Sequence, residues 1–131
     1  MAFRLQMERS IIEAVVERCR EKGCKGAPLV ELLHPGKEDY FVLKPKHSAF
    51  FSTTLDTLLR YLGTETLVVG GFAADICVLF TANDAYMRDL KLFVPADCVV
   101  SNTPEDNAHT LRQMQIVLKA QTKPSTSLQF A

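Results

Sequence analysis

A cysteine and a lysine are the residues of this sequence best placed to do chemistry. Cys77 follows the apolar run 67–69 and a turn of small residues, and it opens a segment with helical periodicity. Lys44 directly follows another apolar run, residues 40–43. Near a helix N-terminus the backbone N–H groups and the helix dipole favour a thiolate over a thiol. A nearby lysine promotes the same ionisation, so the pair predicts nucleophilic catalysis by cysteine.

The turn before Cys77, residues 70–76, favours the same chemistry. Its two glycines and two alanines let a substrate approach the backbone closely. Several N–H groups in such a turn can point beside the sulfur and bind a developing oxyanion. The alternative for Cys77 is a small, inert core residue, because free cysteines are usually buried. The alternative for Lys44 is a solvated lysine in a loop that also carries Lys46.

His47 is a third candidate, as a base for Cys77. The sequence shows no evident Asn or Asp to orient its ring, as cysteine–histidine enzymes require. The four cysteines, at positions 19, 24, 77 and 98, have no CxxC spacing, and none of the three histidines lies near a cysteine in sequence. We therefore predict no metal site and no cofactor.

The segments that must position these residues alternate between helical and strand patterns. The sequence predicts helices over residues 10–22, 54–62, 76–88 and 104–118. It predicts strands over residues 40–43, 66–69 and 91–94, with a last one near 120–123. Residues 24–39 contain prolines and glycine and are predicted to connect elements, with one helical turn. This alternation is typical of an α/β fold, a three-layer α/β/α sandwich with a mostly parallel, Rossmann-like sheet.

Length and composition limit the number of domains, the binding partners and the cellular location that the sequence predicts. A chain of 131 residues predicts a single domain, residues 1–131. Its 15 basic and 15 acidic residues balance, which favours neither nucleic acid nor an anionic membrane surface as a partner. No apolar run approaches the roughly 18 residues of a membrane span, and the N-terminus lacks a signal-peptide pattern. Sparse cysteines without disulfide spacing predict a cytoplasmic protein.

Residues 44–101 resemble the second half of the isochorismatase-like cysteine hydrolase superfamily, which includes nicotinamidases and N-carbamoylsarcosine amidohydrolases. The matching features are a lysine, a Ser-Ala-Phe turn, a Leu-rich helix, a glycine and three dipeptides. They stand here as Lys44, Ser48-Ala49-Phe50, residues 55–62, Gly71, Cys77-Val78, Thr81-Ala82 and Asp84-Ala85. Lys44 and Cys77 are 33 residues apart, a spacing expected of this group. The similarity extends less closely to Ser127.

The resemblance implies a role for each matching residue. Cys77 matches the nucleophile and Lys44 the catalytic lysine. The peptide bond between Phe72 and Ala73 matches one that is cis in the family. The amides of Ala73 and Cys77 match the oxyanion hole. The implied reaction is hydrolysis of the C–N bond of a small amide. Isochorismate, nicotinamide, ureido acids and simple amides are all compatible substrates.

One family feature is missing from the sequence. Family members begin with a buried strand that ends in an aspartate, the base that takes the thiol proton. Residues 1–24 contain no aspartate, and the first in the chain is Asp39. We therefore expect a family member truncated at its N-terminal side, with impaired activity. Its sheet would lack cover for apolar positions such as Val42, Val68 and Val69, which predicts a homo-oligomer.

Three function classes stay open from sequence. The first is a slow amidohydrolase acting on small-molecule amides. The second is a catalytically inactive scaffold or interaction protein that retains the fold. The third is a thiol redox or sensor protein that uses Cys77, although no resolving cysteine lies near it in sequence.

Overall fold

The computed structural model describes residues 2–21 and 24–129, with side chains described from residue 10 onward. The chain forms two compact units, residues 1–43 and residues 44–131, and each is described by itself. No helix in the described part is long and apolar enough to cross a membrane. The single domain predicted over residues 1–131 stays a prediction.

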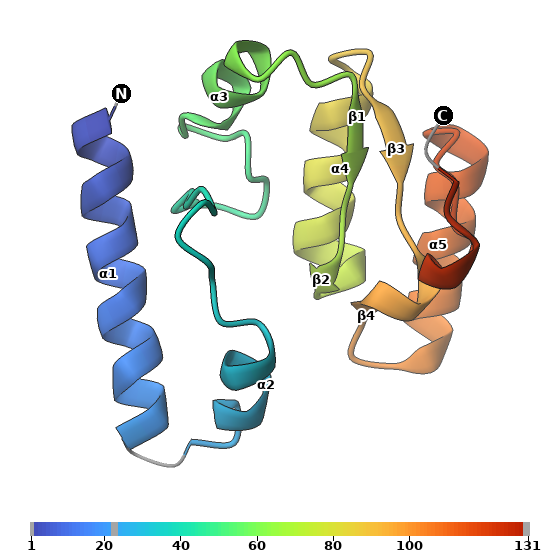
Figure 1. Ribbon diagram of the computed structural model, residues 1–131. Coiled ribbons are helices and arrows are strands. Elements are labelled where there is room, and N and C mark those ends of the chain that lie inside the picture. The colour runs from blue at the N-terminus through green and yellow to red at the C-terminus, as the bar shows by residue number, and fades with distance from the viewer. Residues whose placement is uncertain (1, 22–23, 130–131) are drawn as a thin grey trace. The chain divides into compact units, whose positions relative to one another are not determined.

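The first unit consists of two helices, α1 (Ala2–Glu21) and α2 (Ala27–Leu32) (Figure 1). The helix predicted over residues 10–22 is confirmed but begins earlier, and α2 is the helical turn predicted within 24–39. Pro28 lies in the first turn of α2, where its missing N–H leaves no helical hydrogen bond unmade. Between the helices the Cys24 thiol hydrogen-bonds that of Cys19 and raises the pKa of Cys19.

The strand predicted over residues 40–43 is wrong. This segment has no strand pairing among the described residues, although Phe41 is buried. Tyr40 and Leu43 are exposed, so the run is not covered on both faces. The physical reason is that an extended segment becomes a strand only when a neighbouring strand pairs with its N–H and C=O groups. An apolar run alone does not reveal whether that neighbour exists.

The second unit contains two pairs of parallel strands (Figure 1). Strand β1 (Thr66–Val68) pairs with β3 (Lys91–Phe93), with Leu67 opposite Leu92. Strand β2 (Gly71–Phe72) pairs with β4 (Val99–Val100). The strands predicted near 66–69 and 91–94 are thus confirmed as parallel neighbours. The one predicted near 120–123 is present as a single parallel bridge between Gln121 and Phe93.

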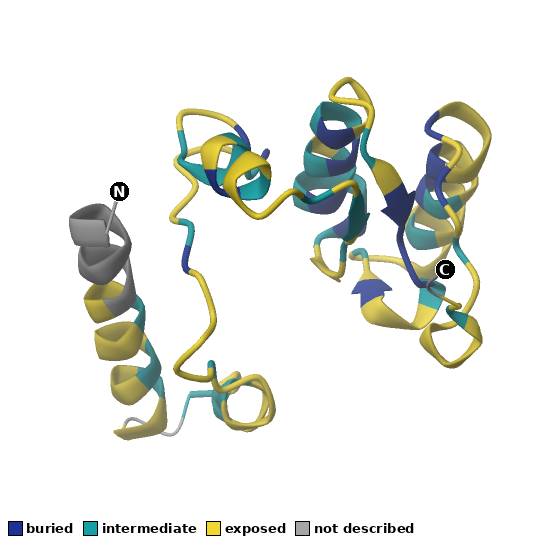
Figure 2. Ribbon diagram, turned by 45° about the horizontal axis from the view of Figure 1, so that its top comes forward, coloured by how far each residue is buried: buried dark blue, intermediate teal, exposed yellow. Residues whose placement is uncertain are grey.

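Helices α3 (Leu55–Tyr61), α4 (Leu79–Tyr86) and α5 (Pro104–Val117) complete the second unit. Leu92, Phe93 and Val94, in and directly after β3, are all buried, as in a strand covered on both faces, while Lys91 stays exposed. Ala82 and Ala85 are fully buried on one face of α4, and their small size permits close packing. Figure 2 shows this core between α4, α5 and the strands. Its buried members are Phe50, Ala74, Val78, Ala82, Ala85, Leu92, Val94, Val99, Met114, Leu118 and Ala120.

The connection from β1 to α4 creates the setting of the predicted site. The chain leaves the carboxyl end of β1, forms β2, and enters a π-helical turn, Ala74–Val78, that continues directly into α4. Helical structure therefore begins two residues before the predicted start at Ile76. Cys77 lies in this first turn, and the carboxyl ends of parallel strands are where α/β folds place their sites.

Within the second unit, the carboxylate of Asp97 holds the C-terminal segment against the turn after β3. Asp97 accepts hydrogen bonds from the hydroxyl and the backbone N–H of Ser125, both at 2.7 Å. These bonds hold the pKa of Asp97 below its usual range. The segment after the Gln121 bridge is thereby tied to the turn after β3.

We predict that Asp97→Asn destabilises the protein in a pH-dependent way. Because the folded-state pKa is lowered, the stabilising contribution is fully present above the unfolded-state pKa of about 3.9. It is lost as the pH falls through the lowered folded-state pKa. Urea unfolding at neutral pH should show the variant less stable than the wild type, and the difference should shrink in acid. A difference that persists unchanged below about pH 3 would contradict the role of the carboxylate.

Candidate active site

Lys44 and Cys77 lie in direct contact. The Lys44 Nζ donates to the Cys77 Sγ at 3.3 Å and to the backbone carbonyl of Lys46, also at 3.3 Å. Cys77 is half-buried in the π-helical turn directly before α4. Both residues belong to the second unit. The predicted proximity of the two is confirmed, and their catalytic roles stay a prediction.

His47 approaches the same sulfur from the loop that carries Lys44. Its Nδ1 lies 3.9 Å from the Cys77 Sγ. Its ring packs against Phe80, with ring centroids 5.4 Å apart and planes tilted by 52°. Phe80 comes three residues after Cys77, so the two share a face of the helical segment. The sequence shows no polar residue that would orient the imidazole, and in the structure the Phe80 ring contacts it.

A set of hydrogen bonds ties the loop 44–50 to α4. The buried Ser48 donates its hydroxyl proton to the carboxylate of Asp84. The Ala49 N–H donates to the Thr81 hydroxyl oxygen at 3.0 Å, and that hydroxyl donates to the Cys77 carbonyl at 2.7 Å. The loop is therefore fixed to the helix one and two turns after the thiol. We call these three bonds the loop–helix clamp.

Arg88 extends the clamp toward α3. Its guanidinium lies 4.5 Å from the centre of the Phe50 ring, a cation–π contact, and donates to the Asp84 carbonyl at 2.8 Å. It also pairs with Asp56 of α3 at 2.9 Å. The sequence patterns did not predict these contacts of Arg88. The sequence feature that could have indicated them is the spacing of positions 77, 81, 84 and 88. It places a thiol, a hydroxyl, a carboxylate and a guanidinium on one face of a helix.

The Phe72–Ala73 peptide bond is cis, as the resemblance implied, and the oxyanion site beside it stays a prediction. Phe72 pairs with Val100 of β4, and its side chain is 71% exposed. The Asp75 N–H donates to the Ser101 hydroxyl at 3.3 Å, so β4 and the residue after it support this turn. The Ala73 carbonyl accepts from the N–H groups of Ile76 and Val78, both at 3.2 Å. These bonds fix the backbone next to Cys77.

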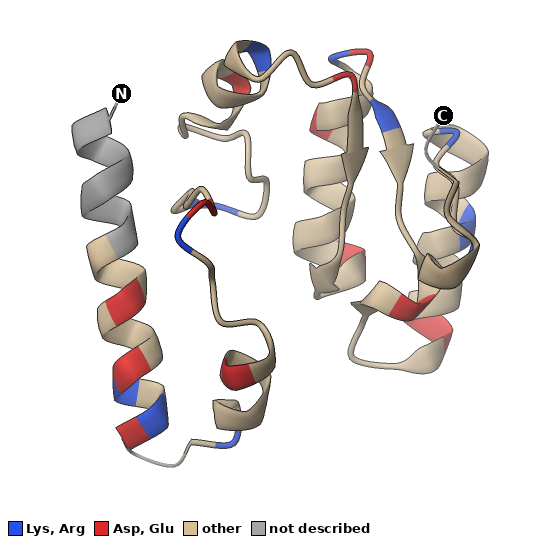
Figure 3. Cartoon of the chain, in the orientation of Figure 1, with Lys and Arg blue, Asp and Glu red and all other residues tan. Residues whose placement is uncertain are grey.

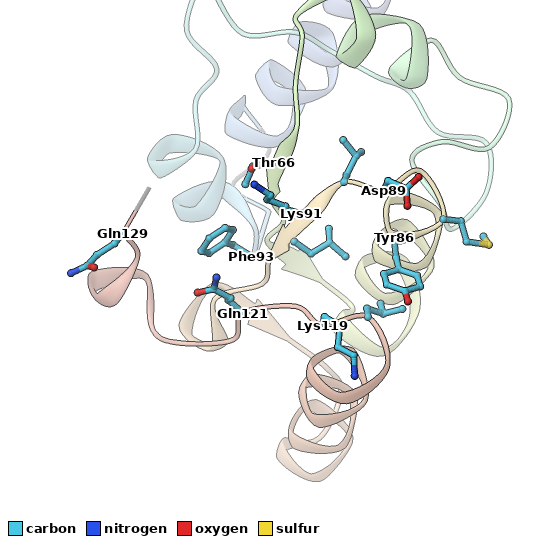
Figure 4. Close-up of a pocket in the computed structure, with 12 residues that line it drawn as sticks. Thr66, Tyr86, Asp89, Lys91, Phe93, Lys119, Gln121 and Gln129 are labelled. Carbon is cyan, nitrogen blue, oxygen red and sulfur yellow. The ribbon is translucent and has the colours of Figure 1, made fainter. Parts of the chain in front are cut away.

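One cavity of the second unit lies away from Cys77. It has a volume of about 880 Å³ and lies along β3 and beside Thr66, the first residue of β1 (Figure 4); neither Lys44 nor Cys77 lines it. Thr66, Lys91, Phe93 and Gln121 are among its lining residues. Since α/β folds place active sites at the carboxyl ends of their strands, this open groove is not the candidate site.

Charge and metal-ligating groups do not suggest another kind of site. Acidic and basic residues both occur in α1, α3 and α5, so neither sign of charge dominates the described part of the chain (Figure 3). Within residues 10–21 and 24–129, no three His, Cys, Asp or Glu side chains converge to form a metal site.

The fold is that of an α/β protein, because parallel strand pairs pack beside helices. Its candidate cysteine site is the contact between the Cys77 thiol and Lys44, beyond the carboxyl end of β1. The sequence model of the isochorismatase domain matches residues 6–127. The chain therefore belongs to the isochorismatase family, as its resemblance to that superfamily predicted.

Two relatives illustrate the similarity in sequence. The chain is 44% identical over 110 residues to the uncharacterized isochorismatase family protein YaaI of Bacillus subtilis, covering 84% of this chain and 60% of that protein. It is 40% identical over 81 residues to the ureidoacrylate amidohydrolase RutB of Methylorubrum extorquens, covering 62% of this chain and 33% of that protein. The chain thus spans between a third and three-fifths of the length of these relatives.

Two crystal structures illustrate the similarity in fold. The nicotinamidase SaPncA of Staphylococcus aureus matches with a TM-score of 0.67 and 32% identity, covering 76% of this chain and 63% of that one. The N-carbamoylsarcosine amidase of Thermoplasma acidophilum matches with a TM-score of 0.65 and 34% identity, covering 73% of this chain and 54% of that one. These matches confirm the predicted three-layer α/β fold class.

We predict that Ser48→Ala lowers the free energy of unfolding by about 1–3 kcal/mol, because it leaves the Asp84 carboxylate without its buried donor. Ser127→Ala, at an exposed position, serves as the matched control and should change stability by less than about 0.5 kcal/mol. Urea unfolding of both variants provides the measurement. Equal stability of the two would show that the clamp does not contribute to folding.

Proposed function

We propose that this chain is a cysteine-dependent hydrolase that cleaves the C–N bond of a small amide. The observation that supports the proposal most is the 3.3 Å contact between the Lys44 ammonium and the Cys77 sulfur. A cationic neighbour favours the thiolate, which is the nucleophilic form of cysteine. Relatives named as amidases, nicotinamidases or amidohydrolases point to the same type of bond.

In the proposed reaction the Cys77 thiolate attacks the amide carbonyl carbon and forms a C–S bond. The carbonyl oxygen becomes an oxyanion that accepts hydrogen bonds from the N–H groups of Ala73 and Cys77. The C–N bond then breaks, the amine leaves with a proton, and water hydrolyses the thioester. The exposed ring of Phe72 offers a surface for the substrate beside this oxyanion site. This chemistry requires neither metal nor cofactor, and a cytoplasmic location would keep the thiol reduced.

An inactive scaffold is the second candidate. A thiol sensor is the third candidate. Alkylation of Cys77 at neutral pH, followed by assay on a panel of small amides, separates the three. Rapid alkylation with turnover supports the hydrolase, rapid alkylation without turnover the sensor, and slow alkylation the scaffold.

We expect Cys77→Ala to abolish hydrolysis, because the acyl-enzyme requires the sulfur. Lys44→Ala should lower kcat/KM on the order of 10²-fold or more, since the thiol loses its cationic neighbour. Lys44→Arg should not restore the rate, because a guanidinium does not exchange its proton with a leaving amine. The measurement is kcat/KM for each variant on the amide panel.

Cys98→Ala and Lys46→Ala are the matched controls for these substitutions, since both positions are exposed. Both should retain the wild-type rate within a few-fold. Hydrolysis that survives Cys77→Ala would refute the proposed nucleophile.

We also propose that the protein associates with itself. Val68, Phe72 and Val100 of β1, β2 and β4 are each more than half exposed, which is unfavourable for apolar side chains in water. Val42 and Val69, expected to lack cover as well, are half-buried. Light scattering at micromolar concentration should give a mass above the 14.6 kDa of one chain. Val68→Lys should weaken the association, whereas a clean monomeric mass for the wild type would contradict it.

A further inference from the structure

We infer that Cys19 and Cys24 form a dithiol site, which small-molecule disulfides oxidise to an intramolecular disulfide that links the end of α1 to the segment before α2. The site lies in the first unit, whereas the residues of the proposed hydrolase site belong to the second. The inference therefore does not depend on the proposed function. Both thiols are free and partly exposed, so a dissolved oxidant can reach them.

The end of α1 brings the two cysteines together. Cys19 lies in the last turn of α1, and the Cys24 N–H donates to the Cys19 carbonyl at 3.4 Å. A hydrogen bond across five residues closes many helices at this end, and the side chains of the two residues that it joins commonly contact each other. Here the two thiols are hydrogen-bonded to each other. Little backbone movement is then needed for a disulfide, whose Cα atoms lie about 4.4–6.8 Å apart.

Cys24 is also connected to α2. Its carbonyl accepts from the Ala27 N–H, at the start of α2, at 2.9 Å. The other link between the helices is an ion pair, in which the Arg20 guanidinium lies 3.9 Å from the Glu31 carboxylate. Both of these side chains are exposed, so the pair contributes little to stability. A covalent bond between Cys19 and Cys24 would hold α2 to α1 more firmly than this pair does.

The two thiols take different steps of the oxidation. The hydrogen bond with Cys24 raises the pKa of the Cys19 thiol. The C-terminal end of a helix disfavours an anion as well. Cys19 is therefore mostly protonated at neutral pH, which favours Cys24 as the first nucleophile and Cys19 as the thiol that completes the disulfide.

The electron balance closes with oxidised glutathione as the oxidant. The Cys24 thiolate attacks one sulfur of glutathione disulfide, and the first glutathione leaves as a thiolate. Cys19 then gives its proton to solvent and attacks the Cys24 sulfur, which expels the second glutathione. The two protein thiols lose two electrons and two protons, and one glutathione disulfide is reduced to two glutathione thiols. A thiol reductant reverses both steps.

The other two cysteines serve as internal references. Among the described residues, the Cys77 and Cys98 sulfurs hydrogen-bond polar groups that include Lys44 and Asp97, rather than a second thiol. With no neighbouring thiol to displace glutathione, both should stop at the mixed disulfide.

The test treats the reduced full-length chain with oxidised glutathione at neutral pH, blocks the remaining thiols with N-ethylmaleimide and cleaves after glutamate without reduction. Cys19 and Cys24 then lie on separate peptides, residues 18–21 and 22–31. Mass spectrometry should find these peptides joined by a disulfide as their main oxidised product. Recovery of the two cysteines mainly as separate mixed disulfides, or joined mainly to Cys77 or Cys98, would overturn the inference.

Two variants test the order of the steps. Cys19→Ser removes the completing thiol, so the mixed disulfide at Cys24 should accumulate at least several-fold above its level in the wild type. Cys98→Ser is the matched control and should form the Cys19–Cys24 disulfide to the wild-type extent. A Cys19→Ser chain that accumulates no mixed disulfide at Cys24 would overturn the assigned order.

Urea separates the contribution of the helix end from nearness in sequence. The unfolded chain keeps the same separation between the cysteines but loses the helix that joins them. The Cys19–Cys24 disulfide should therefore form at least several-fold faster in the folded chain, and equal rates would overturn the role of the helix end. Amide hydrogen exchange in α2 should be slower in the oxidised chain than in the reduced one. Equal exchange would overturn the proposed link between the helices.

Discussion

The attachment of one loop to one helix is the constraint on which the candidate site depends. Lys44 and His47 belong to a loop without regular secondary structure, and a loop alone does not hold two side chains against a sulfur. The buried Ser48–Asp84 bond and the Ala49–Thr81–Cys77 chain of hydrogen bonds provide the missing constraint. Because the Thr81 hydroxyl donates to the carbonyl of Cys77 itself, the loop is positioned relative to Cys77.

We propose that the contact between Lys44 and Cys77 contributes to chemistry rather than to folding. An exposed ion pair contributes only about 0–1 kcal/mol to stability. The same charge beside a thiol alters the balance between thiol and thiolate, and that balance sets the reactivity of cysteine. Stability comes instead from the buried side chains between α4, α5 and β3, including Ala82, Val94 and Met114, which are fully buried. The core positions α4, and the turn that leads into α4 carries the Cys77 sulfur. The loop–helix clamp holds the loop of Lys44 beside that sulfur.

Sequence patterns predicted the helices, the β1–β3 pair and the Lys44–Cys77 contact, but the contact forms for a different reason. The prediction assumed that residues 40–43 form a strand that delivers Lys44 to the sheet edge. No such strand is present among the described residues, and the clamp holds Lys44 in its place. Pairing of residues 40–43 depends on a distant partner, which a local apolar run does not reveal. The two-residue strands β2 and β4 were missed because they are too short to show periodicity. The position of His47 beside the Cys77 sulfur was not predictable, because its contact with Phe80 leaves no polar motif in the sequence.

The proposed function requires that Cys77 carries the most reactive thiol of this protein. The most direct measurement is a site-resolved comparison of alkylation rates for Cys77 and Cys98 in the wild-type chain at neutral pH. Both thiols are free and Cys98 is the more exposed, so accessibility alone favours Cys98. We expect Cys77 to react faster, because the Lys44 ammonium 3.3 Å from its sulfur favours the thiolate. A Cys77 that reacts no faster than Cys98 would contradict the account.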